Sequence, residues 1–142
     1  MKKFVTLSLL VLVAVFNAVQ AQVNFSVQYK RVNPTTIDIV FTGKADAGWH
    51  IYSTDIAEGG PTAASFGVDK IKGAKLKGGL KPGAGVKRMQ DPISKCLVSY
   101  FEGTATFTQR VELTDKNYEL KGYLRYGACN DENCCPPDQR RR

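Results

Sequence analysis

The sequence lacks several features that mark common protein classes. Outside the first residues, no segment repeats apolar side chains with the 3.6-residue period of an amphipathic helix, and there is no internal repeat. No serine lies in a Gly-x-Ser-x-Gly elbow, so a hydrolase of that type has no support. The chain has no second apolar run of the ~20 residues that span a bilayer. We therefore expect no direct membrane insertion of the mature chain.

The first 21 residues have the pattern of a secretory signal peptide. Lys2 and Lys3 precede an apolar run over residues 4–15, and residues 18–21, Ala-Val-Gln-Ala, form a small-x-small cleavage site. An anchor that stays attached is the disfavoured alternative, because the apolar run is too short. We expect an exported protein with a signal peptide over residues 1–21 and a single domain over residues 22–142.

The net positive charge of the mature chain is small. Cleavage removes two lysines from a formal charge of +7 and leaves +5, of which Arg140, Arg141 and Arg142 supply three. The lysines are scattered through turns and form no basic face. We therefore expect no nucleic-acid partner.

Short alternating runs predict strands. The clearest runs cover residues 25–29, 37–41, 105–113 and 118–126. Residues 49–52 and 64–68 predict further strands, and residues 70–87, rich in glycine and lysine, predict short edge strands and turns. Residues 114–117 are expected to connect the last two runs as a hairpin. This pattern predicts an all-β protein with an immunoglobulin-like β-sandwich.

The four cysteines are unevenly placed. Cys96 stands alone, whereas Cys129, Cys134 and Cys135 lie close together near the C-terminus. In an exported protein cysteines favour disulfides, and the polar turn at residues 130–133 can bring Cys129 to either Cys134 or Cys135. Such a short loop stabilises the fold by only ~2 kcal/mol. A bond that is made and broken is therefore favoured over an inert local disulfide, which stays the alternative.

The neighbours of the cysteines suggest a direction for the chemistry. Asp131 and Glu132 lie between the sulfurs, and like charge disfavours a thiolate. A pair whose thiolate is not stabilised tends to reduce its partner. We hypothesise that the pair donates electrons, and a reduction potential as high as that of a strong oxidant would contradict this.

Metal binding is the next alternative. The three clustered cysteines and the single histidine, His50, could supply four zinc ligands, but adjacent cysteines followed by two prolines do not match zinc-site spacing. We interpret His50, between Trp49 and Ile51 on a predicted strand, as a partly buried, hydrogen-bonded side chain. We expect no metal and no cofactor.

Residues 126–137, Tyr-Gly-Ala-Cys-Asn-Asp-Glu-Asn-Cys-Cys-Pro-Pro, resemble the catalytic stretch of the N-terminal periplasmic domain of the thiol:disulfide interchange protein DsbD family. Residues 48–53 resemble the aromatic strand of that family, and residues 91–101 its cap loop and following strand. The resemblance implies an immunoglobulin-like domain in the periplasm of a Gram-negative bacterium. It also implies electron transfer from a membrane-embedded donor domain to periplasmic thioredoxin-like proteins, with a link to cytochrome c biogenesis.

The resemblance assigns roles to individual cysteines. Cys129 matches the first catalytic cysteine, and Cys134 matches the second when Pro136 and Pro137 anchor the comparison. Counting forward from Cys129 selects Cys135 as the alternative second cysteine. The second cysteine would bond to the partner protein, and Cys129 would resolve that bond.

The resemblance also predicts a gate. The cap loop comprises Asp91, Pro92, Ile93 and Ser94, with Ile93 at the position where known members carry a shielding aromatic residue. Shielding of the disulfide would then be smaller. Cys96 lies beside this loop and has no assigned role. It could form a second disulfide with Cys135, act with it as a resolving pair, or be there by chance.

Two other interpretations stay open. The chain could be a non-catalytic exported β-sandwich with structural disulfides, since its strand aromatics are typical of a core. The family's domain continues beyond the two prolines, so the chain could also be truncated at its C-terminus and fold poorly.

Overall fold

The protein is described by a computed structural model covering residues 11–14, 22–92 and 94–134. The strands are β1 (Val11–Ala14), β2 (Val23–Asn33), β3 (Thr36–Ala45), β4 (His50–Ile56), β5 (Ser65–Lys72), β6 (Ala74–Leu76), β7 (Lys81–Pro82), β8 (Lys87–Gln90), β9 (Leu97–Glu102), β10 (Thr104–Leu113), β11 (Glu119–Arg125) and β12 (Ala128–Cys129). The described part of the chain contains strands and no helix, which confirms the all-β prediction. Accordingly, no helix in that part is long and apolar enough to cross a membrane.

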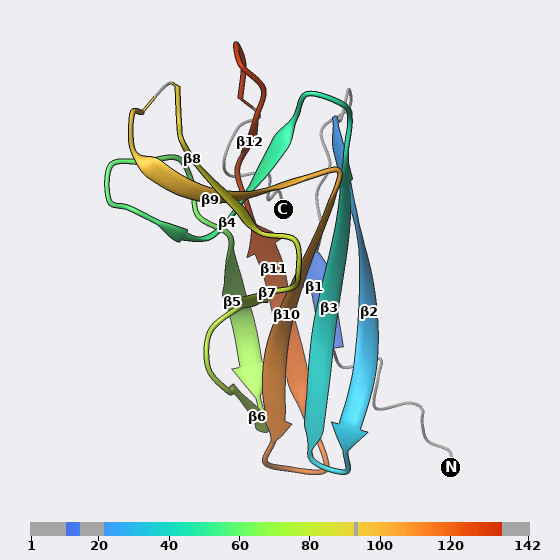
Figure 1. The fold of residues 1–142 in the computed structure, drawn as a ribbon. Coiled ribbons are helices and arrows are strands. Elements are labelled where there is room, and N and C mark those ends of the chain that lie inside the picture. The colour runs from blue at the N-terminus through green and yellow to red at the C-terminus, as the bar shows by residue number, and fades with distance from the viewer. Residues whose placement is uncertain (1–10, 15–21, 93, 135–142) are drawn as a thin grey trace.

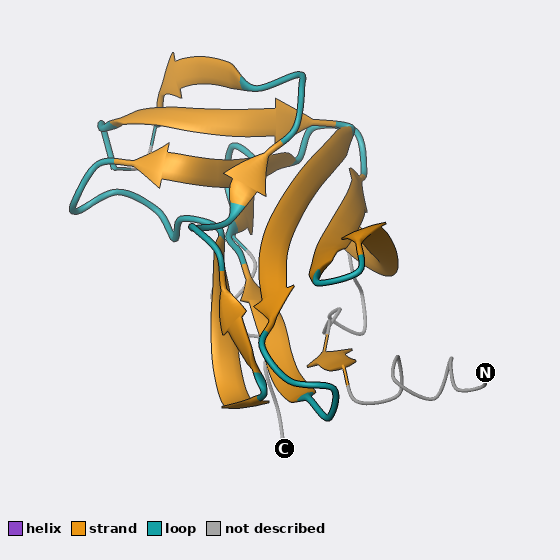
Figure 2. Cartoon of the chain, turned by 90° about the horizontal axis from the view of Figure 1, so that it is seen from below, coloured by secondary structure: helices purple, strands orange, loops and turns teal. Residues whose placement is uncertain are grey.

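The strands form three sheets. The first has the order β2-β3-β10-β6, with β7 also paired to β10; the second has the order β1-β11-β5, and the third β12-β4-β9-β8. Figure 1 shows the long strands β2, β3 and β10 running the length of the molecule with β5 and β11 beside them. The third sheet lies across one end, and Figure 2 shows its strands crossing the direction of the others. This layered arrangement confirms the immunoglobulin-like sandwich.

One main core joins the sheets. Side chains of β3 alternate between buried and partly exposed, as the pleat of a half-buried strand requires. Phe41 and Phe107 are fully buried and directly opposite each other on β3 and β10. The ring of Phe107 meets Phe101 of β9 edge-on, with 5.4 Å between ring centroids. The third sheet is therefore attached to the sandwich through its inner face.

The connection at residues 114–117 differs from the sequence prediction. It does not close a hairpin, because β10 pairs with β3, β6 and β7, whereas β11 pairs with β5 and β1. Both edges of β10 are already occupied by these partners. The chain therefore crosses from one sheet to the other at this point. Alternation identified the two strands but carried no information about their partners.

Strand β1 comes from the segment predicted to be removed as a signal peptide. Its four residues pair in parallel with Leu120–Tyr123 of β11. Cleavage after Ala21 would remove this strand and leave β5 as the partner of β11 among the described strands. The cleavage itself stays a prediction.

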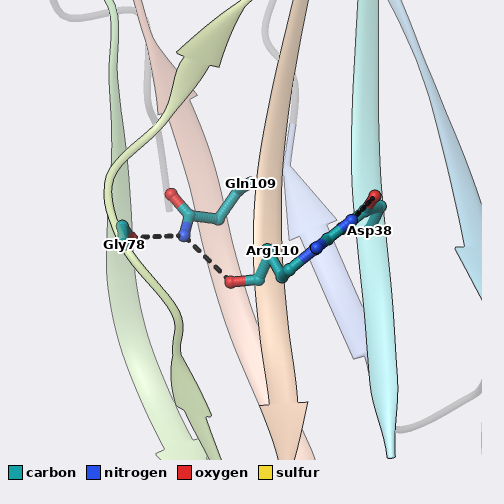
Figure 3. Close-up of polar contacts among 4 residues, drawn as sticks. All are labelled: Asp38, Gly78, Gln109 and Arg110. Carbon is teal, nitrogen blue, oxygen red and sulfur yellow. Dashed lines mark hydrogen bonds and ion pairs between the residues drawn. The ribbon is translucent and has the colours of Figure 1, made fainter. Parts of the chain in front are cut away.

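Polar side chains fix the pairing of β3 with β10 (Figure 3). Arg110 Nε and Nη2 donate to the two carboxylate oxygens of Asp38 on the neighbouring strand, at 2.8 and 3.0 Å. Gln109 points to the opposite side, where its Nε2 donates to the carbonyl oxygen of Gly78 at 3.0 Å. Gln109 thus ties β10 to the segment after β6, whereas a one-residue slip of β3 along β10 would separate Arg110 from Asp38.

We expect the Asp38–Arg110 pair to make stability depend on acid pH. The hydrogen bond from Arg110 lowers the pKa of Asp38, and the charges of Arg110 and Lys30 act in the same direction. A lowered folded-state pKa stabilises the fold above the unfolded pKa of ~3.9, and this contribution is lost as pH falls through the folded value. Asp38→Asn should lower the free energy of unfolding by about 1 kcal/mol at pH 7.

Urea unfolding of both proteins from pH 7 down to pH 2 measures this difference. The gap between the wild-type protein and Asp38→Asn should close below about pH 4. Asp115→Asn is the matched control. Asp115 is exposed, and its carboxylate accepts a hydrogen bond from the backbone N–H of Asn117. A gap that stays constant across the whole range would contradict the assignment.

Candidate functional site

The third sheet buries side chains on both of its faces. Ile51, Phe101 and Ala128 belong to the main core. Their chain neighbours Tyr52, Tyr100 and Cys129 belong to a separate cluster. Successive residues of a strand point to opposite sides, so the same three strands attach this sheet to the sandwich and carry a second apolar cluster on the other face.

We call this second group the outer cluster. Its buried members are Tyr52, Val98, Tyr100 and Cys129, and Ile56, Met89 and Cys96 pack against them. It draws on β4, β8, β9 and β12 and on the loop that joins β8 to β9. One sulfur of the predicted redox pair is therefore part of a small apolar core.

The disulfide joins Cys129 to Cys134. Cys129 follows Ala128 on β12, which pairs with His50 and Ile51 of β4. Cys129 is only 5% exposed, whereas Cys134 is exposed. An incoming protein therefore has access to Cys134 first.

The turn between the two cysteines closes on itself. Asn130 N donates to the carbonyl oxygen of Asn133 at 2.8 Å. The side-chain Oδ1 of Asn130 accepts from the backbone N–H groups of Glu132 and Asn133, at 2.9 and 2.5 Å. An asparagine that binds the backbone two or three residues ahead favours a tight turn. This turn places Cys134 opposite Cys129 as an isolated bridge.

The cap loop, residues 91–94, is anchored by a buried acid. Asp91 is 2% exposed, and its Oδ1 accepts a hydrogen bond of 2.6 Å from the hydroxyl of Tyr52. Its Oδ2 accepts from the backbone N–H of Ser94 at 2.7 Å. Since Tyr52 lies in the outer cluster, this contact ties the loop to the apolar group that contains Cys129.

Backbone contacts complete the loop. Asp91 N donates to the carbonyl oxygen of Cys96, and Lys95 N donates to that of Asp91, both at 2.8 Å. Lys95 has a φ of 67°, the left-handed conformation that lets the chain turn back. The Oγ of Ser94 accepts from Cys96 N at 3.3 Å. Figure 1 shows this loop and the β12 turn at the same end of the molecule.

The hydrogen bond between Tyr52 and Asp91 stays intact at neutral pH because the pKa of Tyr52 is raised. Burial raises the pKa of Tyr52, and the hydrogen bond with Asp91 and the charge of that carboxylate raise it further. The phenol therefore stays protonated and continues to donate.

His50 is the residue of β4 that lies opposite Cys129 in the sheet. It is the direct cross-strand partner of Cys129 on one side and of Glu102 on the other. Its Nδ1 is 3.7 Å from Glu102 Oε2, and its ring meets Tyr100 edge-on with centroids 4.8 Å apart. The side chain is 15% exposed, which matches the expected partial burial. The sequence also predicted a hydrogen bond for this side chain. The buried Nδ1, however, has no hydrogen-bond partner within the described residues.

The remaining predicted site residues are placed as follows. Pro92 is exposed, Ser94 is partly buried, and Cys96 is a free cysteine packed against the outer cluster. Ile93 and Cys135 lie outside the described residues. The structure thus brings Cys129, Cys134 and the cap loop to one end of the molecule (Figure 1).

Sequence reasoning did not assign the anchor between Tyr52 and Asp91. Alternation could have placed Val98 and Tyr100 on one face of their strand, because they are two residues apart. The same rule places His50 and Tyr52 on one face of the other strand. No local signal connects Tyr52 to Asp91, which lies 39 positions away. Across the described ranges, no three His, Cys, Asp or Glu side chains are grouped so that they could hold a metal ion.

Two comparisons with known proteins found a match, one to a family and one to a fold. Residues 16–142 match the family described as "Thiol:disulfide interchange protein DsbD, N-terminal". The fold is similar to the crystal structure of the N-terminal periplasmic domain of ScsB from Proteus mirabilis, with a TM-score of 0.59 and 13% identity. That likeness covers 80% of this chain and 42% of the ScsB chain. No curated protein matches this sequence.

We expect Tyr52→Phe to release the cap loop. It removes the donor to a buried carboxylate, which should lower the free energy of unfolding by about 1.5–3 kcal/mol. A loosened loop should also speed reduction of the Cys129–Cys134 disulfide by dithiothreitol. Urea unfolding and the rate of thiol appearance measure the two effects.

Tyr118→Phe is the matched control. Tyr118 is buried like Tyr52, but its hydroxyl has no hydrogen-bond partner within the described residues. Removing an unpaired buried hydroxyl should leave stability unchanged or raise it slightly. Equal losses in the two variants would rule out the anchor.

Proposed function

This chain belongs to the family of DsbD N-terminal thiol:disulfide interchange domains, and on that basis we propose that it relays electrons in the periplasm through Cys129 and Cys134. The reduced pair accepts its electrons from a membrane-embedded donor domain. It passes them to thioredoxin-like proteins, including those that serve cytochrome c biogenesis. The observation that carries the proposal is the unequal exposure of the two sulfurs of the disulfide.

The difference in exposure supports different roles for the two cysteines. The exposed Cys134 is the sulfur that a partner can approach, and the buried Cys129 is reached only from within the domain. A sulfur that resolves a mixed disulfide needs access to its neighbour and not to solvent. Cys134 therefore bonds to the partner, and Cys129 resolves that bond.

The exchange proceeds in two displacements. The Cys134 thiolate attacks one sulfur of the partner's disulfide, a Cys134–partner bond forms, and the partner's other sulfur leaves as a thiolate. Cys129 then attacks Cys134, the Cys129–Cys134 bond forms, and the second partner sulfur leaves. Two electrons have passed to the partner, and the dithiol of this chain has become a disulfide. The membrane donor regenerates the dithiol by the reverse sequence.

The alternative is an exported β-sandwich in which the disulfide is only structural. The bond closes a separation of five residues, so the loop-closure model gives it ~2 kcal/mol of stabilisation. The two functions differ in one measurable property. A relay must titrate reversibly in the range of biological thiol buffers, whereas a structural bond stays oxidised there.

We expect the Cys129–Cys134 pair to titrate reversibly across glutathione buffers. Alkylation of free thiols followed by peptide mass spectrometry identifies the cysteines that change state. A reducing domain should titrate at a potential well below the ~−120 mV of a strong periplasmic oxidant. A bond that stays closed throughout would support the structural alternative.

We further expect Cys129→Ser to accumulate a mixed disulfide through Cys134. Removal of the resolving sulfur leaves the first displacement intact and blocks the second. Cys134→Ser should form no such adduct, and Cys96→Ser is the matched control with the pair intact. The adduct with an oxidised thioredoxin-like protein is read on a non-reducing gel. Accumulation in Cys134→Ser instead would reverse the two roles.

A further inference from the structure

We propose that His50, held by Glu102, accepts the proton of the Cys129 thiol when Cys129 resolves the mixed disulfide. The inference deepens the proposed function and rests on it. It gives a chemical role to a histidine that the sequence marks only as a strand residue.

The sheet register puts His50 directly opposite Cys129. His50 and Cys129 are direct partners in the antiparallel pair of β4 and β12. Directly opposite side chains share a face, with Cβ atoms about 4.5–5.5 Å apart. Tyr100, whose ring meets that of His50 edge-on, lies in the same outer cluster as Cys129. The register therefore places a proton acceptor beside the resolving cysteine.

Burial makes such an acceptor necessary. Cys129 is 5% exposed, so bulk water has little access to its thiol proton. The thiolate is the nucleophile in disulfide exchange, and the thiol must therefore lose that proton before it attacks. A side chain on the same face is a shorter route for the proton than the solvent.

Glu102 fixes the orientation of the ring. Its Oε2 is 3.7 Å from the buried Nδ1 of His50, which has no hydrogen-bond partner within the described residues. An unprotonated Nδ1 would direct its lone pair at this carboxylate and be repelled by it. A protonated Nδ1 would direct an N–H at the carboxylate and be attracted to it. The proposal therefore puts the resident proton on Nδ1 and leaves Nε2 to accept the proton from Cys129.

Charged and titratable groups from three strands surround His50. On β9 the ring faces Glu102 and Tyr100, and on β12 it faces Cys129. Lys87 of β8 donates to the other oxygen of Glu102 at 2.8 Å and offsets part of its charge. The hydrogen bond from Lys87 lowers the pKa of Glu102 and keeps it a carboxylate.

The cap loop and the cysteine turn contribute further acids. Asp91 of the cap loop is engaged by Tyr52 on the same face of β4. Asp131 and Glu132 of the turn are exposed. Solvent screens the charges of the two exposed acids.

The step balances in protons and electrons. The proton moves from Cys129 Sγ to His50 Nε2, and the resulting thiolate attacks Cys134 Sγ of the mixed disulfide. The Cys129–Cys134 bond forms, and the partner sulfur leaves with the electron pair of the broken bond. The imidazolium then gives its proton to that thiolate or to water, and the neutral ring is restored.

A two-phase reaction isolates this step. A chain carrying Cys96→Ser and Cys135→Ser is reduced and mixed with the chromogenic disulfide dithiobis(nitrobenzoate). Attack by one cysteine releases a first coloured thiolate, and resolution by the other releases a second. The rate of the second phase is measured from pH 5 to pH 9 with and without His50→Gln.

The second phase is expected to slow about 10-fold at pH 7 in His50→Gln, with the first phase unchanged. An ordinary thiol is ~3% ionised at pH 7, which sets ~30-fold as the upper limit for this kind of assistance. The wild-type and variant rates should converge above about pH 8.5, where an ordinary thiol ionises without assistance. The variant's rate should continue to rise to about pH 8.5. Equal second-phase profiles in the two proteins would overturn the inference.

Two further variants separate proton transfer from folding. Free imidazole should restore the second phase of His50→Ala, which a purely structural role would not allow. Glu102→Gln changes a half-exposed residue and should slow the second phase, because the ring loses the carboxylate that orients it. If free imidazole does not restore the second phase of His50→Ala and Glu102→Gln has no effect on it, the role of His50 is contradicted. This holds even if His50→Gln folds poorly. Absence of a second coloured thiolate in the wild-type pair would instead contradict the proposed function.

Discussion

The two-sided pleat of the β12-β4-β9-β8 sheet is the constraint on which the site depends. One set of side chains, including Ile51 and Phe101, is buried in the main core. The intervening set, including Tyr52 and Cys129, forms the outer cluster. Because the period of a strand is two, the register that anchors the sheet to the sandwich also determines which side chains surround the disulfide. Packing of the core and placement of the site are therefore one structural problem.

The buried contact between Tyr52 and Asp91 connects this sheet to the loop above it. A carboxylate that is 2% exposed is costly unless its oxygens are hydrogen-bonded, and both oxygens of Asp91 accept bonds here. The loop thereby gains a fixed point without an apolar core of its own. The free thiol of Cys96 packs at the base of the same loop. The outer cluster thus holds the cap loop and one sulfur of the disulfide in a single unit.

Local pattern predicted the strands better than their partners. Alternation identified the regions of β2, β3, β10 and β11, since it reports which residues face a core. It wrongly joined β10 to β11, because proximity in sequence favours a hairpin whenever both strands have a free edge. In the folded chain, β3 on one side and β6 with β7 on the other occupy the edges of β10. Such competition between distant strands leaves no trace in a local window.

The sequence by itself determined the all-β class and the cluster of cysteines, because both depend on residues that are close along the chain. The resemblance of the cysteine segment to a known family led to the same family that residues 16–142 match. Only the tertiary structure decided that Tyr52 bonds to Asp91 and that His50 lies between Cys129 and Glu102. Those contacts join residues 39 or more positions apart. They follow from sheet register, which is set by how the whole core packs and not by the local order of amino acids.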